Sequence, residues 1–72
     1  MMDMVSVDSS SLAAIGYDYP KRTLRVEFLS GSVYDYREVD PEVFQLFLKA
    51  PSKGSFFDRN IKDCGYPFIR LA

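Results

Sequence analysis

The stretch TLRVEFLSGSVYDYREV, residues 23–39, holds two runs in which apolar and polar residues alternate, separated by a short turn. Alternation with a period of two is typical of strands that bury one face. Gly31 can adopt the left-handed backbone conformation that closes a three-residue loop of Leu29, Ser30 and Gly31. The loop predicts an antiparallel hairpin that pairs Phe28 with Ser32, Val26 with Tyr34, Leu24 with Tyr36 and Arg25 with Asp35.

The segment LAAIGYDY, residues 12–19, alternates in the same way and leads into a turn at Pro20 and Lys21. We expect a second hairpin that sets Tyr17 beside Leu24, Ile15 beside Val26 and Ala13 beside Phe28. One face of the meander then requires a cover, because it collects Ala13, Ile15, Tyr17, Leu24, Val26, Phe28, Tyr34 and Tyr36. The other face is mixed and carries Leu12, Ala14, Gly16, Arg25, Glu27, Val33, Asp35 and Arg37.

After Val39 the pattern becomes helical, and residues 41–50 predict the helix that covers the apolar face. Asp40 suits the N-cap and Pro41 the first helical position, while Pro51 ends the helix. The residues expected to be buried on this helix are Val43, Phe44, Leu46, Phe47, Leu48 and Ala50.

A second, short helix is expected within SKGSFFDRNIKD, residues 52–63, with Ser52 or Ser55 as its cap. Phe57 and Ile61 should face inward, and Arg59 and Lys62 outward. The last segment, YPFIRL at residues 66–71, reads as a terminal strand or extended arm whose pairing partner is open. The predicted fold class is therefore α+β: an antiparallel meander of about three strands, one covering helix, a short second helix and a C-terminal extended segment.

Composition excludes several classes of function. The 72 residues form one small domain with a net charge of −1, one cysteine and no histidine. An intramolecular disulfide, a Cys/His zinc site and histidine acid–base catalysis are therefore excluded, and we expect no enzyme activity, no metal site and no cofactor. Neither a signal-peptide pattern nor a membrane-length apolar run is present, so we expect a cytoplasmic protein without a membrane partner.

Residues 44–72 carry five basic against two acidic side chains, which makes this third of the chain the candidate anion-facing region. Within it, SKGS at residues 52–55 sets two hydroxyls, a lysine and a glycine at the start of a helix, where backbone N–H groups attract phosphate. Plain helix capping by the same residues is the simpler alternative.

Tyr34 and Tyr36 share a face of their strand, either as an exposed platform for nucleobases or as core. The predicted register favours core, because it places both on the face of Leu24 and Val26. An intermediate arrangement is open, in which the rings line a cleft beside a helix and only their polar tips meet a ligand.

Five segments taken together resemble the KTSC domain, which is named for its occurrence at the C-terminus of some lysyl-tRNA synthetases. They are SSSLAAIGYD, TLRVEFLSG, VYDYREV, LKAPSKGSFFDRNIK and YPFIRL, and the resemblance covers about residues 5–71 of a single domain spanning residues 1–72. Its most specific part is the spacing of Gly31, Tyr34, Tyr36, Ser52, Gly54, Phe56 or Phe57, and Ile61. Pro51 and the Asp40–Pro41 pair are not features to assume in every member of the family.

The resemblance implies a small stand-alone bacterial or phage protein, and its synthetase context suggests RNA binding. We therefore expect a non-catalytic module that binds RNA or another phosphate-bearing ligand. Two alternatives stay open: a protein-interaction or homo-oligomerisation module that uses the outer sheet face or an edge strand, and an oligomer that sequesters a small nucleotide between subunits. The candidate ligand-binding residues are Ser52, Lys53, Gly54, Ser55, Arg59, Lys62, Arg70, Tyr34 and Tyr36.

Overall fold

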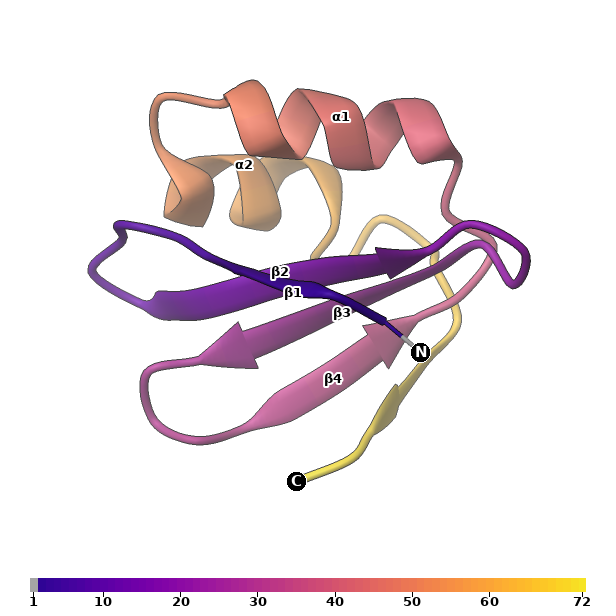
Figure 1. Ribbon diagram of the computed structural model, residues 1–72, viewed down its shortest axis with the longest axis horizontal. Helices are drawn as coiled ribbons and strands as arrows, with labels where there is room; N and C mark the ends of the chain where they lie inside the picture. Colours follow the sequence, from indigo (N-terminus) through magenta and orange to yellow (C-terminus); the bar gives the residue numbers. More distant parts are fainter. Residues whose placement is uncertain (1) are drawn as a thin grey trace.

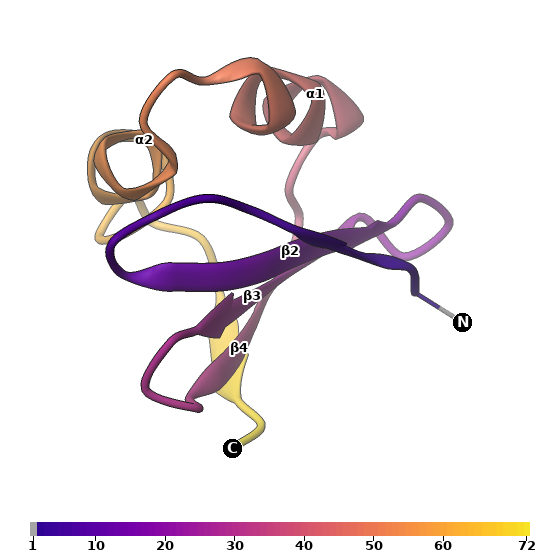
Figure 2. The same cartoon turned by 60° about the vertical axis from the view of Figure 1, so that its left-hand side comes forward.

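The computed structural model describes residues 2–72. It is an α+β fold in which two helices lie on the same side of a twisted five-stranded antiparallel sheet, as Figures 1 and 2 show from two directions. Strand order follows chain order from β1 to β5. The elements are β1 Met4–Ser6, β2 Leu12–Asp18, β3 Thr23–Phe28, β4 Val33–Tyr36, α1 Pro41–Lys49, α2 Lys53–Asn60 and β5 Phe68–Arg70.

The predicted meander is present as β2, β3 and β4, and one short strand extends it at each edge, β1 beside β2 and β5 beside β4. The C-terminal segment pairs with β4, which settles the partner that the sequence left open. The strand β1, which pairs with β2, was not predicted. Its three residues are all exposed, so it has no buried face to give an alternating pattern.

The β3–β4 hairpin has the predicted register. Gly31 has φ +98° and donates its N–H to the carbonyl of Phe28, whose own N–H donates to the carbonyl of Ser32. Arg25 faces Asp35 and binds its carboxylate with two hydrogen bonds of 2.7 and 3.0 Å. This bidentate ion pair stabilises the register, since a slip by one residue would separate the charges.

The β2–β3 hairpin departs from the prediction at one point. Tyr17 pairs with Leu24 and Ile15 with Val26 as expected, but a bulge at Ala13 sets Leu12, not Ala13, opposite Phe28. An extra residue on one strand shifts the alternation by one, so side chains beyond it change face. Leu12, predicted on the outer face, is consequently fully buried in the core.

The outer face of the sheet is less open to solvent than the mixed pattern indicated. Ala14 and Asp35 are each only 8 % exposed. Gly16 pairs with Met4 of β1, and a Cβ atom there would stand 2.5 Å from the sulfur of Met4. The missing side chain of Gly16 thus leaves room for the side chain of Met4.

Helix α1 covers the inner face through Phe44 and Phe47, which are buried, while Val43 and Leu48 pack at the margins. Burial of Leu46 was predicted and is wrong, because this side chain is 55 % exposed. Leu46 follows Phe44 by two residues and therefore points about 200° around the helix from it. Asp40 occupies the N-cap position but makes no capping hydrogen bond; its carboxylate accepts one from Arg22 instead.

Helix α2 has the expected cap and inner face. The hydroxyl oxygen of Ser52 accepts the N–H of Ser55, and both Phe57 and Ile61 are buried. Phe56 stacks on Phe47 with ring centroids 4.9 Å apart, which joins the two helices. Among the described residues, neither helix has the length and apolar character needed to cross a membrane.

Candidate ligand-binding cleft

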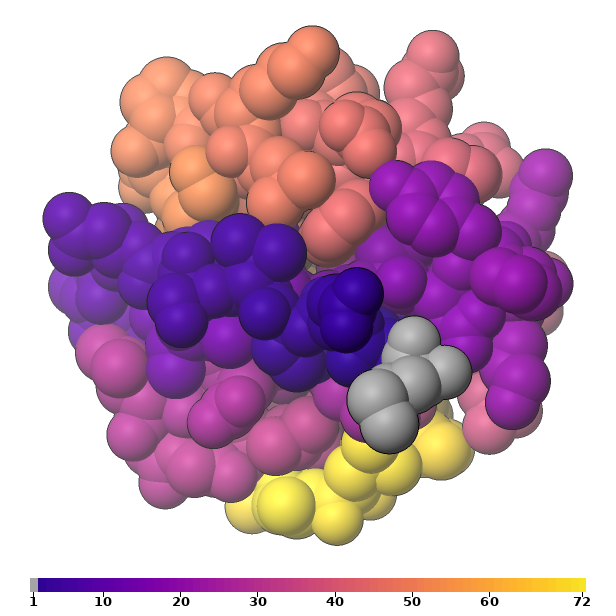
Figure 3. Space-filling view, viewed as in Figure 1, coloured from indigo at the N-terminus to yellow at the C-terminus, as the bar shows by residue number. Residues whose placement is uncertain are grey.

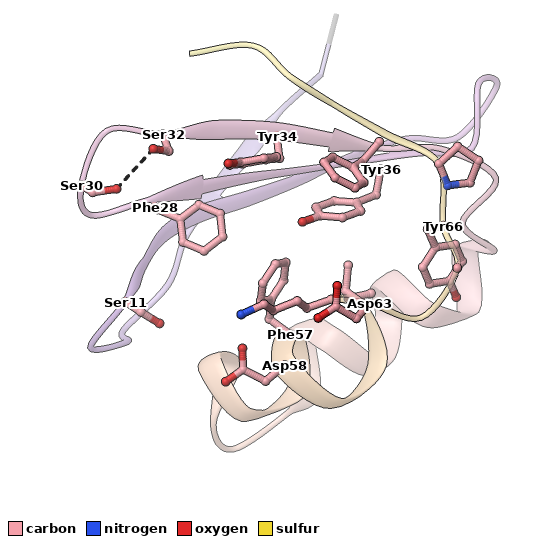
Figure 4. A pocket seen from close by; sticks show the side chains of 15 residues that line it. Ser11, Phe28, Ser30, Ser32, Tyr34, Tyr36, Phe57, Asp58, Asp63 and Tyr66 are labelled. Atoms are coloured by element: carbon pink, nitrogen blue, oxygen red, sulfur yellow. Dashed lines mark hydrogen bonds between the residues drawn. The ribbon is translucent and has the colours of Figure 1, made fainter.

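A cleft of about 890 Å³ opens between the inner face of β4 and β5 and the side of α2, including the segment that follows α2. Figure 4 shows it from close by, with the tyrosines of β4 facing the helix. Its lining residues are Ser11, Phe28, Ser30, Ser32, Tyr34, Tyr36, Phe57, Asp58, Ile61, Lys62, Asp63, Gly65, Tyr66, Pro67 and Phe68.

Aromatic rings form the sheet side of the cleft. Tyr34 and Tyr36 stack with centroids 6.3 Å apart, and Phe68 of β5 packs against them at 5.9 and 5.5 Å. Phe57 of α2 meets Tyr36 edge-on at 5.8 Å. Tyr36 is only 7 % exposed and belongs to the core, whereas Tyr34 is half-buried. Both tyrosines therefore point inward, and both also line the cleft.

Burial raises the pKa of the Tyr36 hydroxyl above its usual value, and the neighbouring Tyr34 and Asp63 raise it further. The reason is that a phenolate is poorly solvated there and is repelled by the carboxylate of Asp63. Tyr36 thus stays neutral around pH 7, where its hydroxyl can both donate and accept a hydrogen bond.

Charges of both signs surround the rings. Lys62, Asp58 and Asp63 line the helix side of the cleft. On the sheet side, the guanidinium carbon of Arg70 lies 5.9 Å from the centre of the Tyr34 ring. Arg70 also donates hydrogen bonds to Ser32 Oγ and to the carbonyl of Ala72, which hold it over the ring at the edge of the cleft.

The predicted phosphate site lies in a separate cavity of about 380 Å³, at the start of α2. Its lining residues are Asp8, Ser9, Ser10, Ser11, Pro51, Ser52, Lys53, Gly54, Ser55 and Asp58. Ser52 is occupied as the helix cap, and the ammonium group of Lys53 donates to the carbonyl of Ala50. Gly54 faces Ser11, whose oxygen would stand 3.2 Å from an added Cβ atom.

The structure therefore divides the predicted site residues into two groups. Lys62, Tyr34 and Tyr36 line the cleft, and Arg70 lies at its edge. The residues from Ser52 to Ser55 line the other cavity, and Arg59 lines neither.

Phe68, Phe57, Asp58 and Asp63 were not among the predicted site residues, although the cleft includes them. The signal for Phe68 was its spacing of two residues from Arg70, which sets both side chains on one face of the terminal segment. It could be used only once the pairing of that segment with β4 was known.

Comparison with known proteins places the chain in a family. The KTSC domain model matches residues 8–66. An uncharacterised protein of Stutzerimonas stutzeri is 43 % identical over 70 residues, which cover 97 % of this chain and 99 % of that protein. A lysine–tRNA ligase of Nostoc punctiforme is 39 % identical over 59 residues, covering 82 % of this chain but only 10 % of the ligase.

A solved structure agrees over the whole length. The crystal structure of a KTSC domain protein from Yersinia pestis superposes with a TM-score of 0.92 at 36 % sequence identity, covering 100 % of both chains. The predicted resemblance is confirmed: the chain belongs to the KTSC domain family.

Proposed function

We propose that this protein is a non-catalytic binding module whose aromatic cleft takes a nucleobase and the neighbouring phosphate of single-stranded RNA. The observation that carries the proposal is the arrangement of Tyr34, Tyr36 and Phe68 beside one another, with Arg70 over the Tyr34 ring and Lys62 on the opposite wall. Aromatic faces next to cationic side chains are the usual means of binding unpaired bases.

Each group in the cleft has a role in this proposal. A base stacked on the half-buried Tyr34 ring would gain about 1–3 kcal/mol. Lys62 and Arg70 would face the phosphate, while Asp58 or Asp63 would accept a hydrogen bond from an exocyclic amino group of the base. Because these carboxylates also repel phosphate, a discrete contact with base and phosphate is favoured over broad binding to any polyanion.

The absence of catalysis is part of the same proposal. The sequence has no histidine, and the raised pKa of Tyr36 keeps its hydroxyl protonated, so this hydroxyl is not a general base at neutral pH. Relatives that include lysine–tRNA ligases support a cytoplasmic setting in which RNA is at hand.

The test is a binding titration with single-stranded RNA and, separately, with mono-, di- and cyclic nucleotides. Lys62→Ala should weaken binding by about tenfold, because it removes a charge-assisted contact. Arg59→Ala is the matched control: it removes the same charge close by from a residue outside the cleft, and binding should change little. Tyr34→Leu keeps an apolar side chain but removes the ring, and should also weaken binding.

Single-stranded RNA and free nucleotides are expected to give different results in this titration. RNA binding that falls steeply with added salt supports the proposal. Tight binding of a discrete nucleotide, with RNA excluded, would favour the nucleotide-sequestering alternative. Equal losses for Lys62→Ala and Arg59→Ala, or no binding of any of these ligands, would refute a site in the cleft.

Oligomerisation is the second candidate function. It is favoured by a different observation, the exposed apolar residues of β5, which include Phe68 and Ile69.

A further inference from the structure

The strand β5 leaves one of its edges without a partner in the part of the chain that the structure describes. Toward β4, the carbonyl of Pro67 accepts the N–H of Arg37, and the N–H of Leu71 donates to the carbonyl of Val33. In an antiparallel ladder, residues with backbone groups on one side alternate with residues whose groups lie on the other. The N–H and C=O groups of Phe68 and Arg70 therefore point to the free edge.

Proline does not block this edge. The N–H that Pro67 lacks would point toward β4, on the same side as its bonded carbonyl. The side chains along the edge are also unusually open for apolar residues, with Phe68 57 %, Ile69 44 % and Leu71 46 % exposed. An edge strand with exposed apolar side chains and one arginine has little protection against pairing with another chain.

The helices do not cover this part of the molecule. Figure 1 shows β5 at the opposite end of the sheet order from β1 and below both helices, and Figure 3 shows the C-terminal segment along the outer border of the same view. A second strand can therefore approach β5 in the plane of the sheet.

We propose that a second copy of this chain occupies the edge, with the two β5 strands pairing antiparallel about a two-fold axis at Ile69. Phe68 then faces Arg70 of the second copy, and Arg70 faces Phe68 of the second copy. Both are residues whose backbone groups point outward, so each of these pairs closes two hydrogen bonds. The result is a continuous sheet across two chains.

This edge is complementary to itself in this register, which is why we choose this register and a second copy of the chain as the occupant. In it, each guanidinium meets an aromatic ring on the cleft side, and the two Ile69 side chains meet on the opposite face. An axis at Arg70 would set two like charges against each other. An axis at Phe68 would leave Arg70 opposite Tyr66, which lies outside β5.

The proposed pairing of the two β5 strands does not depend on the proposed function, but it would bring the two clefts together. Arg70 and Phe68 lie on the cleft side of the sheet, so the two clefts would open on the same face and meet at the axis. Ile69 pairs with Asp35 and lies on the other face, which allows the edge to be tested without altering the cleft.

The experiment measures mass in solution over a concentration series, by sedimentation velocity and native mass spectrometry. The wild type should reach twice the chain mass of 8.3 kDa. Ile69→Lys and Ile69→Glu, each alone, should be monomers because like charges meet at the axis. Mixed together they should form a heterodimer, because the charges are then opposite.

Leu46→Lys is the matched control: it replaces another exposed apolar residue with lysine, but on α1, and should remain dimeric. Circular dichroism checks that each variant is folded. A wild type that stays monomeric up to its solubility limit would overturn the proposal. This holds even if a strand of another protein were found to pair with the edge of β5. Dimers that survive both Ile69 substitutions would also overturn it, by excluding this register.

Discussion

Tyr17 and Tyr36 place phenol groups in the core on either side of Leu24, and each side chain is less than a tenth exposed. The hydroxyl of Tyr17 donates a hydrogen bond to the carbonyl of Val39, where the chain leaves the sheet for α1. Burial raises the pKa of both tyrosines, and for Tyr17 the positive charge of Arg22 opposes that effect. The folded state therefore favours both groups in their neutral form.

Stability should accordingly fall in strongly alkaline solution. In the unfolded chain a tyrosine ionises near pH 10, whereas Tyr17 and Tyr36 ionise at higher pH when folded. Their stabilising contribution is complete below about pH 10 and is lost as the pH rises through the folded pKa values. Urea unfolding at pH 8 to 11 measures this loss.

The double variant Tyr17→Phe, Tyr36→Phe should lose less stability over that alkaline range. The single variants Tyr17→Phe and Tyr36→Phe should each remove part of the pH dependence, because burial raises the pKa of each hydroxyl separately. If the double variant kept the full wild-type dependence, burial of these phenols would not be its source.

At the scale of elements, the start of α2 shows how a local signal can be read in two ways. The SKGS segment has the composition of a phosphate-binding helix start, yet Ser52 caps the helix and Lys53 bonds to Ala50. In the structure these two polar side chains are already used within the protein. Capping is therefore the role that the observed hydrogen bonds support.

Replacing the capping oxygen should destabilise the protein measurably. Ser52→Ala removes the acceptor for the N–H of Ser55 and should lower the free energy of unfolding by about 1 kcal/mol. Ser55→Ala in the same turn retains that bond, since only the backbone of Ser55 takes part, and should be nearly neutral. Chemical denaturation of both variants would detect the difference; equal losses would contradict the capping role.

Elements with a buried face and a clear turn were predictable. The alternation around Gly31 gave the β3–β4 register, and the Asp40–Pro41 start gave α1. The bulge at Ala13 was not predictable from the sequence. The segment LAAIG has small or apolar residues on both faces of the strand, so its pattern tolerates a shift of one residue. Leu46 shows that apolarity alone does not predict which side of a helix is buried.

At the scale of the whole molecule, α1 holds the helical layer on the sheet through Phe47. This side chain is fully buried and stacks on Phe56, so it joins the core to both helices. A chain of 72 residues has a total stability of about 4–11 kcal/mol, so one such contact is a large fraction of it.

Phe47→Ala should cost about 3–5 kcal/mol, which is between about a quarter and all of that stability, and should lower the thermal midpoint strongly. Leu46→Ala changes the adjacent residue, which is 55 % exposed, and should shift the thermal midpoint only slightly. Thermal unfolding of both variants, monitored by circular dichroism, measures the difference between their midpoints. Similar midpoints for the two variants would show that α1 does not anchor the fold in this way.

The sequence by itself determined the fold class, the central hairpin and both helices, because each follows from contacts between residues near in the chain. For Tyr34 and Tyr36 it favoured an inward direction and left a place in a cleft open. Only the tertiary structure decided that β1 pairs with β2, that β5 pairs with β4, and that the cleft exists. Strands of three exposed residues carry too little pattern to specify a partner. The cleft forms when β5 lies beside β4 and brings Phe68 to Tyr36, two residues far apart in the sequence.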